Sequence, residues 1–328
     1  MHNDLVFDIK KFAILLMGPT ASGKTALAIA LAKIYPIEIV SVDSALVYRD
    51  MNIGTAKPTI AEQTLIRHHL IDLISPLESY SVADFLKDAM RAASDILSRG
   101  KIPLFVGGTM MYYNALINGI SELPASNPQV RSQIEEILLH KGVNYLYEEL
   151  KNVDPLISQK IMPTDTQRII RALEVYQLTN VPMSTLQHQI KPKINHDLNF
   201  LGFRIIPNNR EVLHNRINTR FLQMLNNGFI DEVQNIRNRY PNLTINHTSM
   251  RSVGYKHVWQ YLDKEISYDD LLQMGQAATR QLAKRQLTWL KNMNYANVIK
   301  LINLNDLETV NNLDMEITAN IEKILTNL

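Results

Sequence analysis

Cysteine is absent from this sequence of 328 residues. The chain therefore contains no disulfide bond, no thiolate metal site and no cysteine nucleophile, which is consistent with a reducing compartment. Long hydrophobic runs are also lacking. The apolar run Phe12 to Met17 follows charged residues and ends at Gly18. It is too short for a signal peptide or a bilayer span, so we expect a cytoplasmic protein with no membrane partner.

A strong charge of one sign is lacking overall, because the formal net charge is only +2. The distribution is uneven, however. The stretch from Arg204 to Lys300 holds 14 Lys and Arg against 7 Asp and Glu, whereas Leu301 to Leu328 holds one lysine against five acidic residues. Such a basic stretch suits a surface that contacts a polyanion, although a solvated face with ordinary charge scatter explains the composition as well.

Internal repeats and low-complexity segments are absent too, and the first third of the chain alternates two patterns. Apolar, β-branched runs predict strands, and Ala- and Leu-rich or amphipathic stretches predict helices between them. The alternation predicts an α/β fold with a P-loop NTPase-like parallel sheet flanked by helices, which binds ligands at the carboxyl ends of its strands. The predicted strands are Phe12–Met17, Ile37–Val42 and Ile102–Val106, and the predicted helices are Thr25–Ile34 and Ser81–Leu97.

From about Ser121 the pattern changes to long amphipathic segments with proline between them, which predicts an all-helical insertion. A strand-like stretch from Asn199 to Ile206 then returns the chain to the sheet. We therefore predict a P-loop core with C-terminal helices from residues 1–120 and 199–328, and a helical insertion domain from residues 121–198. Helices are expected at 127–140, 145–151, 154–160 and 165–178 in the insertion, and at 210–226, 230–239 and 268–291 after it.

The stretch Gly18 to Thr25 reads GPTASGKT and matches G-x-x-x-x-G-K-[ST]. A predicted strand precedes it and a predicted helix follows, which is the context that the motif requires. In such a loop, backbone amides and the helix N-terminus bind phosphates, Lys24 adds a positive charge, and the Thr25 hydroxyl is placed to ligate Mg²⁺. We expect a ligand carrying at least a diphosphate here, and a nucleotide is the common one.

The acid that usually completes the Mg²⁺ site of an ATPase or GTPase is missing, because the strand Ile102–Val106 runs into Gly-Gly-Thr. An acid follows the earlier strand instead. Asp43 comes directly after Ile37–Val42, and a doubly wound sheet places that strand end near the P-loop. Asp43 is a candidate to accept a proton or to join a metal shell, and capping the turn at Asp43-Ser44 is its alternative role.

Two helical segments carry further basic residues. Arg216 and Arg220 lie four residues apart and share a helix face, so they either face an anion or form a solvated pair. Further on, Arg280, Lys284 and Lys291 share one side of a helix whose other side is apolar. An amphipathic packed helix explains the apolar side, and the basic side suggests phosphate contact.

From Lys11 to about Lys291 the sequence resembles the tRNA dimethylallyltransferase family, also called isopentenyl-pyrophosphate:tRNA transferases. Without cysteine it lacks the C-terminal zinc finger of many eukaryotic members, so it resembles the shorter bacterial form. The segments that carry the resemblance are Gly18–Thr25, Ser41–Tyr48, Gly54–Pro58, His68–Asp72, Val106–Thr109, Asp165–Glu174, Arg216 with Arg220, Gly254-Tyr255 and Lys284–Lys291.

The resemblance implies a prenyl transferase with Mg²⁺ as its cofactor, bound at Thr25, and dimethylallyl diphosphate as its donor. It would transfer the dimethylallyl group to the exocyclic N6 of the adenosine immediately 3′ of the anticodon, giving N6-(dimethylallyl)adenosine and diphosphate. Asp43 would accept the proton, and Thr20, Lys24 and Arg220 would assist the leaving group. The implied diphosphate-binding residues are Gly18, Pro19, Thr20, Ala21, Ser22, Gly23, Lys24, Thr25, Arg216 and Arg220.

The resemblance also implies that the chain, expected as a monomer, binds the anticodon stem-loop of tRNA. One implied contact, Trp289, either packs inside the protein or stacks on a base. The implied tRNA-binding residues are Asp43, Ser44, Ala45, Leu46, Thr109, Arg131, Gln167, Arg168, Ile169, Ile170, Arg171, Arg251, Ser252, Val253, Gly254, Tyr255, Lys256, Lys284, Arg285, Gln286, Leu287, Thr288, Trp289, Leu290 and Lys291.

Two alternative functions stay open at the level of the sequence. The first is an isopentenyltransferase acting on free AMP, or a small-molecule P-loop kinase, although neither substrate needs the basic stretch after Arg204. The second is an RNA-binding NTPase module that uses phosphate binding as a switch. Turnover of ATP or GTP, or prenylation of AMP without tRNA, distinguishes these alternatives from the transferase.

Overall fold

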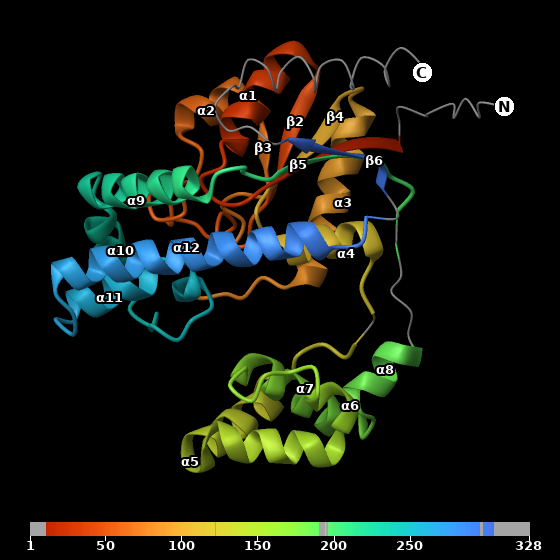
Figure 1. The fold of residues 1–328 in the computed structure, drawn as a ribbon, viewed down its shortest axis with the longest axis vertical. Coiled ribbons are helices and arrows are strands. Elements are labelled where there is room, and N and C mark those ends of the chain that lie inside the picture. The colour runs from red at the N-terminus through yellow and green to blue at the C-terminus, as the bar shows by residue number, and fades with distance from the viewer. Residues whose placement is uncertain (1–10, 122, 190–193, 195, 296–297, 305–328) are drawn as a thin grey trace. The chain divides into compact units, whose positions relative to one another are not determined.

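A parallel sheet organises the larger unit of the chain in this computed structural model, which describes residues 11–121, 123–189, 194, 196–295 and 298–304. Its six strands lie in the order β3-β2-β4-β1-β5-β6 (Figure 1). The predicted α/β class and the predicted strands are confirmed, whereas β3 and β6 were not expected from the sequence. The strands are β1 (Phe12–Met17), β2 (Ile37–Val42), β3 (His68–His69), β4 (Ile102–Gly107), β5 (Asn199–Ile205) and β6 (Val298–Leu304).

Strands β1 and β2 are buried on both faces, because helices cover the sheet on both sides. Alternate side chains of β1 enter different cores: Leu15 packs with α3 (Val82–Ser98) and α4 (Met110–Asn118), and Leu16 packs with α1 (Lys24–Ile34). Ser81 accepts a hydrogen bond from the amide of Asp84, and the two residues form a capping box at the start of α3. A short helix, α2 (Ile60–Leu65), precedes β3.

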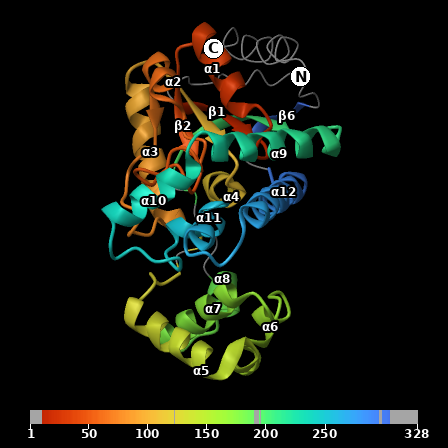
Figure 2. The ribbon, with the colours of Figure 1, turned by 90° about the vertical axis from the view of Figure 1, so that its left-hand side faces the viewer.

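The C-terminal helices form a third core that also encloses the loop after β2. Figure 2 shows α9 and α12 running beside each other, and the two helices are in contact. Val47 and Tyr48, from the loop that begins at Asp43, are buried in this core together with Phe229 and Tyr255. This core therefore holds the loop that follows β2 in place. Its helices are α9 (Arg210–Asn226), α10 (Phe229–Arg239), α11 (Tyr255–Leu262) and α12 (Tyr268–Asn292), with a 3-10 turn at Ser249–Arg251.

Contacts divide the chain into two compact units, one from Met1–Ile117 and His196–Leu328, the other from Asn118–Asn195. In the described part of the second unit the elements are helices, and Ile134, Leu150 and Ile169 lie in its own core. Gly142, at φ 80°, breaks α5 into the two helices expected there. The helices of this unit are α5 (Pro128–Val153), α6 (Pro155–Ser158), α7 (Thr166–Thr179) and α8 (Met183–Gln189).

Within the residues that the structure describes, no helix combines the length and the hydrophobicity that crossing a bilayer requires. Most of the acidic C-terminal stretch noted in the sequence lies outside the described residues.

Candidate active site

The P-loop lies between β1 and α1, and its lysine contacts the loop itself. Lys24 Nζ donates to the carbonyl oxygen of Pro19 at 2.6 Å and lies 3.5 Å from Ser22 Oγ. Gly23, which precedes α1, has a left-handed backbone with φ 86°. Helix α1 therefore begins at Lys24 with its N-terminal amides at the loop, the arrangement that binds phosphate groups.

Three charged groups from three elements gather beside this loop. Burial lowers the pKa of Lys24 to about 7, with Asp43 opposing that shift and Arg220 adding to it. Burial also lowers the pKa of Arg220, against the attraction of Asp43. The charge of each group shifts the pKa of another, so the P-loop, the end of β2 and α9 meet in one partly enclosed site. Clusters of shifted pKa values of this kind mark candidate active sites.

The carboxylate of Asp43 lies at the start of the loop after β2. Burial raises its pKa, while the amides of Ala45 and Leu46 and the charges of Lys24 and Arg220 oppose the rise. Asp43 Oδ1 accepts a hydrogen bond from the Ala45 amide at 2.8 Å. Asp43 therefore fills the turn-capping role considered from the sequence and also belongs to the charged cluster, so the two roles are compatible.

The end of β4 supports the turn at Asp43. Thr109, a predicted tRNA contact, accepts a hydrogen bond from the Ser44 amide at 3.0 Å through its hydroxyl, and its own amide donates to the Val42 carbonyl at 3.1 Å. A Cβ on Gly107 would lie 2.0 Å from that carbonyl oxygen. Only glycine allows β4 to approach Val42 this closely, so Gly107 and Thr109 together fix the backbone on both sides of Asp43.

Gln286 of α12, a predicted tRNA contact, lies between the P-loop and the end of β4. Its Oε1 accepts a hydrogen bond from the Thr20 amide at 2.8 Å, and its Nε2 donates to the Gly108 carbonyl at 2.9 Å. The residue is 8% exposed. The neighbouring residues Lys284, Arg285, Thr288, Trp289 and Lys291 are exposed, so α12 presents one side to solvent and inserts Gln286 into the site.

Several predicted tRNA contacts have enclosed side chains. Tyr255 is 0% exposed, and its hydroxyl donates to Glu232 at 2.6 Å. Ile169, Ile170 and Leu290 are also buried. The side chains of these four residues pack inside the protein and stabilise their helices. At these positions only backbone atoms are available to contact RNA. Exposed side chains in the same predicted set are those of Ser44, Gln167, Arg168, Arg251, Lys256, Lys284, Arg285, Thr288, Trp289 and Lys291.

The arginines predicted to bind tRNA in the second unit have partners within that unit. Arg171 pairs with the fully buried Glu174 at 3.0 Å and donates to the Pro124 carbonyl at 2.6 Å. Arg131 pairs with Glu135 at 3.0 Å. Arg171 therefore links α7 to the segment before α5.

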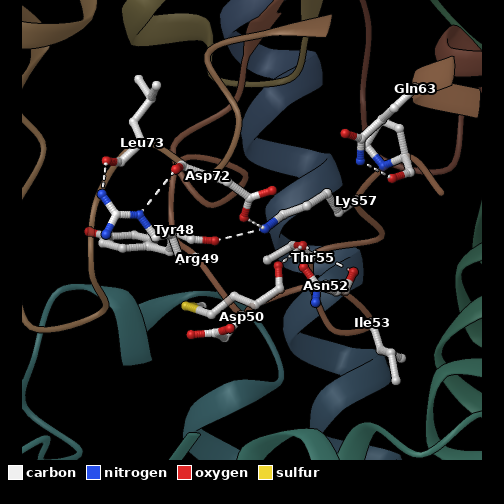
Figure 3. Close-up of polar contacts among 12 residues, drawn as sticks. Tyr48, Arg49, Asp50, Asn52, Ile53, Thr55, Lys57, Gln63, Asp72 and Leu73 are labelled. Carbon is white, nitrogen blue, oxygen red and sulfur yellow. Dashed lines mark hydrogen bonds and ion pairs between the residues drawn. The ribbon is translucent and has the colours of Figure 1, made fainter. Parts of the chain in front are cut away.

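Sequence reasoning attached no role to Lys57, which fixes the loop after Asp43 (Figure 3). Its side chain is only 3% exposed, donates to the Tyr48 carbonyl at 2.8 Å and pairs with the carboxylate of Asp72. Arg49 donates to the Leu73 carbonyl at 2.7 Å. No hydrophobic periodicity predicts a buried lysine in a loop. The sequence indicates a role for Lys57 only through the segment Gly54–Pro58, which is one of those that resemble the family.

Glu232 of α10 is a second residue that the sequence did not single out. Its carboxylate accepts hydrogen bonds from the amides of Asn52, Ile53 and Gly54 at 2.9, 2.6 and 3.2 Å, and from the Tyr255 hydroxyl. Glu232 therefore holds the backbone that leads to Lys57.

The residues present fit a Mg²⁺ ion that arrives with a diphosphate. Among the described residues there is no group of three or more His, Cys, Asp or Glu that would hold a metal by itself. Mg²⁺ is commonly bound through one or two carboxylates together with substrate phosphates and water. Thr25 is exposed at the start of α1, and the charge of Asp43 acts on the adjacent Lys24, so the two residues match that requirement.

A P-loop that opens the first helix of a parallel sheet, with an acid and an arginine beside its lysine, is typical of α/β enzymes of the P-loop type, a class that binds phosphorylated substrates. The family model described as IPP transferase matches residues 46–293, and the model described as isopentenyl transferase matches residues 12–78. The chain belongs to the IPP transferase family, which confirms the resemblance seen in the sequence.

Curated relatives and solved structures agree with this assignment. A tRNA dimethylallyltransferase of Chromobacterium violaceum is 52% identical over 281 residues, covering 86% of each chain. One from Neisseria meningitidis is 50% identical, covering 85% of this chain and 89% of its own. The full-length tRNA isopentenylpyrophosphate transferase of Bacillus halodurans superposes with a TM-score of 0.64 at 33% identity, covering 96% of this chain and 98% of its own. A eukaryotic dimethylallyltransferase acting on tRNA gives 0.78 at 28% identity, covering 97% and 80%.

Proposed function

We propose that this chain transfers a dimethylallyl group from dimethylallyl diphosphate to the exocyclic N6 of the adenosine immediately 3′ of the anticodon in tRNA, giving N6-(dimethylallyl)adenosine and diphosphate. The observation that carries the proposal is the position of Asp43 beside the P-loop lysine and Arg220. This arrangement supplies a cradle for a leaving diphosphate and a carboxylate for an incoming amine. Relatives about half identical to this chain are tRNA dimethylallyltransferases.

Most of the catalysis must act on the donor, because the lone pair of an adenine amine is delocalised into the ring. As the C–O bond to diphosphate breaks, the allylic carbon becomes electron-poor and negative charge accumulates on the diphosphate. The P-loop amides, Lys24 and Arg220 are placed to stabilise that charge. Lys24 donates to the Pro19 carbonyl, and we propose that its ammonium turns to the diphosphate when the substrate binds. The Thr20 hydroxyl is proposed to donate to the bridging oxygen.

Asp43 is the proposed acceptor of the amine proton as the C–N bond forms. Burial raises the pKa of its carboxyl, which makes the carboxylate a stronger base. The Ala45 amide and the positive charges of Lys24 and Arg220 favour its ionised form and oppose that rise. The hydrogen bond from Ala45 also orients the carboxylate through Oδ1.

Mg²⁺ is the proposed cofactor, held by the Thr25 hydroxyl together with substrate phosphates. When bound, it neutralises phosphate charge and orients the donor. This agrees with the exposed hydroxyl at the first turn of α1 and with the paucity of protein ligands in the described site.

The proposed tRNA surface combines the exposed residues of α12 between Lys284 and Lys291 with Arg251 and Lys256 near the start of α11. Lys284, Arg285 and Lys291 offer positive charge to phosphates, and the exposed Trp289 is available to stack on a base. An enzyme that reacts at one base has to take it out of the stack, and a loop base costs the least to extrude. The anticodon stem-loop is therefore the proposed partner of a monomeric protein, in the cytoplasm where tRNA is found.

The two alternatives predict different products. An enzyme acting on free AMP, or a small-molecule kinase, needs no basic surface on α12. An RNA-binding NTPase would hydrolyse ATP or GTP, and β4 ends in Gly107 where an Mg²⁺-binding acid is usual. Both observations favour the transfer to tRNA.

The test is mass spectrometry of nuclease-digested tRNA after incubation with the protein, Mg²⁺ and dimethylallyl diphosphate. We expect a dimethylallyl mass increment on one adenosine next to the anticodon. The increment should be lost with Asp43→Ala and kept with Asp269→Ala, which alters an exposed acid on α12. Unmodified tRNA with intact donor, or prenylated AMP in place of tRNA, would overturn the proposal.

A further inference from the structure

The side chain of Gln286 joins two loops that are far apart in sequence. Thr20 of the P-loop donates its amide hydrogen to Oε1 at 2.8 Å, and Nε2 donates to the Gly108 carbonyl at 2.9 Å. We propose that Gln286 is a positioning residue of the diphosphate site, and that it sets the P-loop at a fixed distance from the turn that carries Asp43. This inference rests on the proposed function.

The chemistry of the bridge requires a primary amide. One partner is a donor and the other an acceptor, so the side chain has to accept with one atom and donate with the next. Glutamine does both, whereas glutamate, methionine and leucine do not. A Cβ on Gly108 would lie 2.4 Å from Gln286 Nε2, so glycine leaves the room that the amide occupies.

Contact with RNA is a poor explanation for Gln286. It is 8% exposed, and both polar atoms of its side chain are bonded inside the protein. Its neighbours Arg285 and Thr288 are exposed on the solvent side of α12. The same helix therefore has one face available to a polyanion and one residue inserted into the catalytic core.

The bridge continues toward the proposed base. Thr109 follows Gly108, and its hydroxyl accepts from the Ser44 amide at 3.0 Å. Hydrogen bonds thus run from Thr20 through Gln286 to Gly108, and from Thr109 to the residue next to Asp43. In a transfer reaction the donor and the base must be held to within a fraction of an ångström of their productive positions. A connection between their two loops therefore contributes to the rate as well as to the affinity.

The experiment compares Gln286→Met and Gln286→Glu with the wild-type protein. Gln273→Met, the same change at an exposed position of α12 before its basic segment, is the matched control. Calorimetry with inorganic pyrophosphate and Mg²⁺ measures the diphosphate site, and fluorescence anisotropy with tRNA at one fixed salt concentration measures the RNA surface. Steady-state kinetics then give KM for dimethylallyl diphosphate and kcat.

We expect Gln286→Met to raise the pyrophosphate dissociation constant and the donor KM by about tenfold, since two hydrogen bonds that shape the loop are lost. Gln286→Glu should bind pyrophosphate more weakly still, because its negative charge lies beside the phosphate-binding amides. The tRNA dissociation constant should stay within about twofold for both variants. Gln273→Met should match the wild type in every measurement.

A weakened tRNA affinity with unchanged pyrophosphate affinity would identify Gln286 as an RNA contact and overturn the proposal, and so would an unchanged affinity for both. Circular dichroism and thermal melting show whether each variant folds, and the near-isosteric Gln286→Glu keeps the test valid if Gln286→Met does not. Failure of the proposed function is distinguishable, because the wild type would then bind pyrophosphate without prenylating tRNA.

Discussion

The ammonium group of Lys57 lies 2.8 Å from the carbonyl oxygen of Tyr48 and donates a hydrogen bond to it. The lysine side chain is 3% exposed and also pairs with the carboxylate of Asp72. The Asp72 amide donates to the Leu46 carbonyl at 3.1 Å. One buried cation therefore fixes the path of the loop that begins at Asp43.

Replacing Lys57 with methionine should slow the reaction without weakening diphosphate binding. Met leaves the buried Tyr48 carbonyl without this donor, so we expect the free energy of unfolding to fall by about 1–3 kcal/mol. A displaced Asp43 loop should lower kcat by about 10- to 100-fold. Denaturant unfolding and single-turnover kinetics measure the two effects. Lys87→Met, at an exposed position of α3, is the control, and an unchanged kcat would contradict the positioning role.

Asp43→Asn should separate chemistry from binding. The amide oxygen of asparagine still accepts from Ala45, so the turn keeps its geometry, but the base is lost. We expect kcat to fall by about 10²–10⁴ if Asp43 is the general base. The pyrophosphate dissociation constant should stay equal or decrease, because a negative charge beside Lys24 is removed. A weaker pyrophosphate complex with an unchanged rate would assign Asp43 to binding.

Arg220→Met should act mainly on the diphosphate. The guanidinium is partly enclosed near Lys24 and Asp43, so its hydrogen bonds to a phosphate are charge-assisted. We expect the pyrophosphate dissociation constant to rise by about 10- to 100-fold, as measured by calorimetry. Arg210→Met, which removes an exposed arginine at the start of α9, should leave it unchanged. Equal effects of the two variants would show that only net charge matters.

Glu38 should make the stability of the fold depend on pH far below neutrality. Burial alone would raise the pKa of this carboxyl, but hydrogen bonds from Lys101, His69 and Arg99 lower it from 4.5 to about 2. A depressed pKa in the folded state means that the stabilisation is fully present above about pH 4.5. It is lost as the pH falls toward 2, where the folded protein also binds the proton.

Glu38→Gln should reduce the free energy of unfolding at neutral pH and flatten its decline between pH 4.5 and 2. The glutamine leaves three basic partners around a neutral group that is 2% exposed. Urea unfolding across this pH range measures the effect, with the exposed Glu136→Gln as control. Parallel pH curves for wild type and Glu38→Gln would show that other carboxylates cause the decline.

Local patterns predicted much of the fold. A continuous apolar run predicts β1, the Gly-rich motif predicts the turn into α1, and Ser81 with Asp84 predicts the start of α3. Each depends on residues within a few positions of one another. The sequence did not predict several short elements. Elements α2, β3 and α11 are too short to show a clear hydrophobic periodicity, and α4 follows Gly-Gly-Thr without a distinct cap in the sequence.

The sequence by itself determined the identity of the phosphate-binding loop and of its lysine, because that motif is contiguous and its backbone geometry is local. Only the tertiary structure decided which distant groups surround it. Gln286 lies 266 residues from Thr20 in the chain, yet it accepts a hydrogen bond from that amide. Lys57 belongs to no periodic pattern in the sequence. Its side chain is buried because the segments after β2 and β3 pack around it. Such contacts depend on the order of strands in the sheet and on helix packing. Both arise from the burial of apolar surface over the whole chain, so no local sequence pattern predicts them.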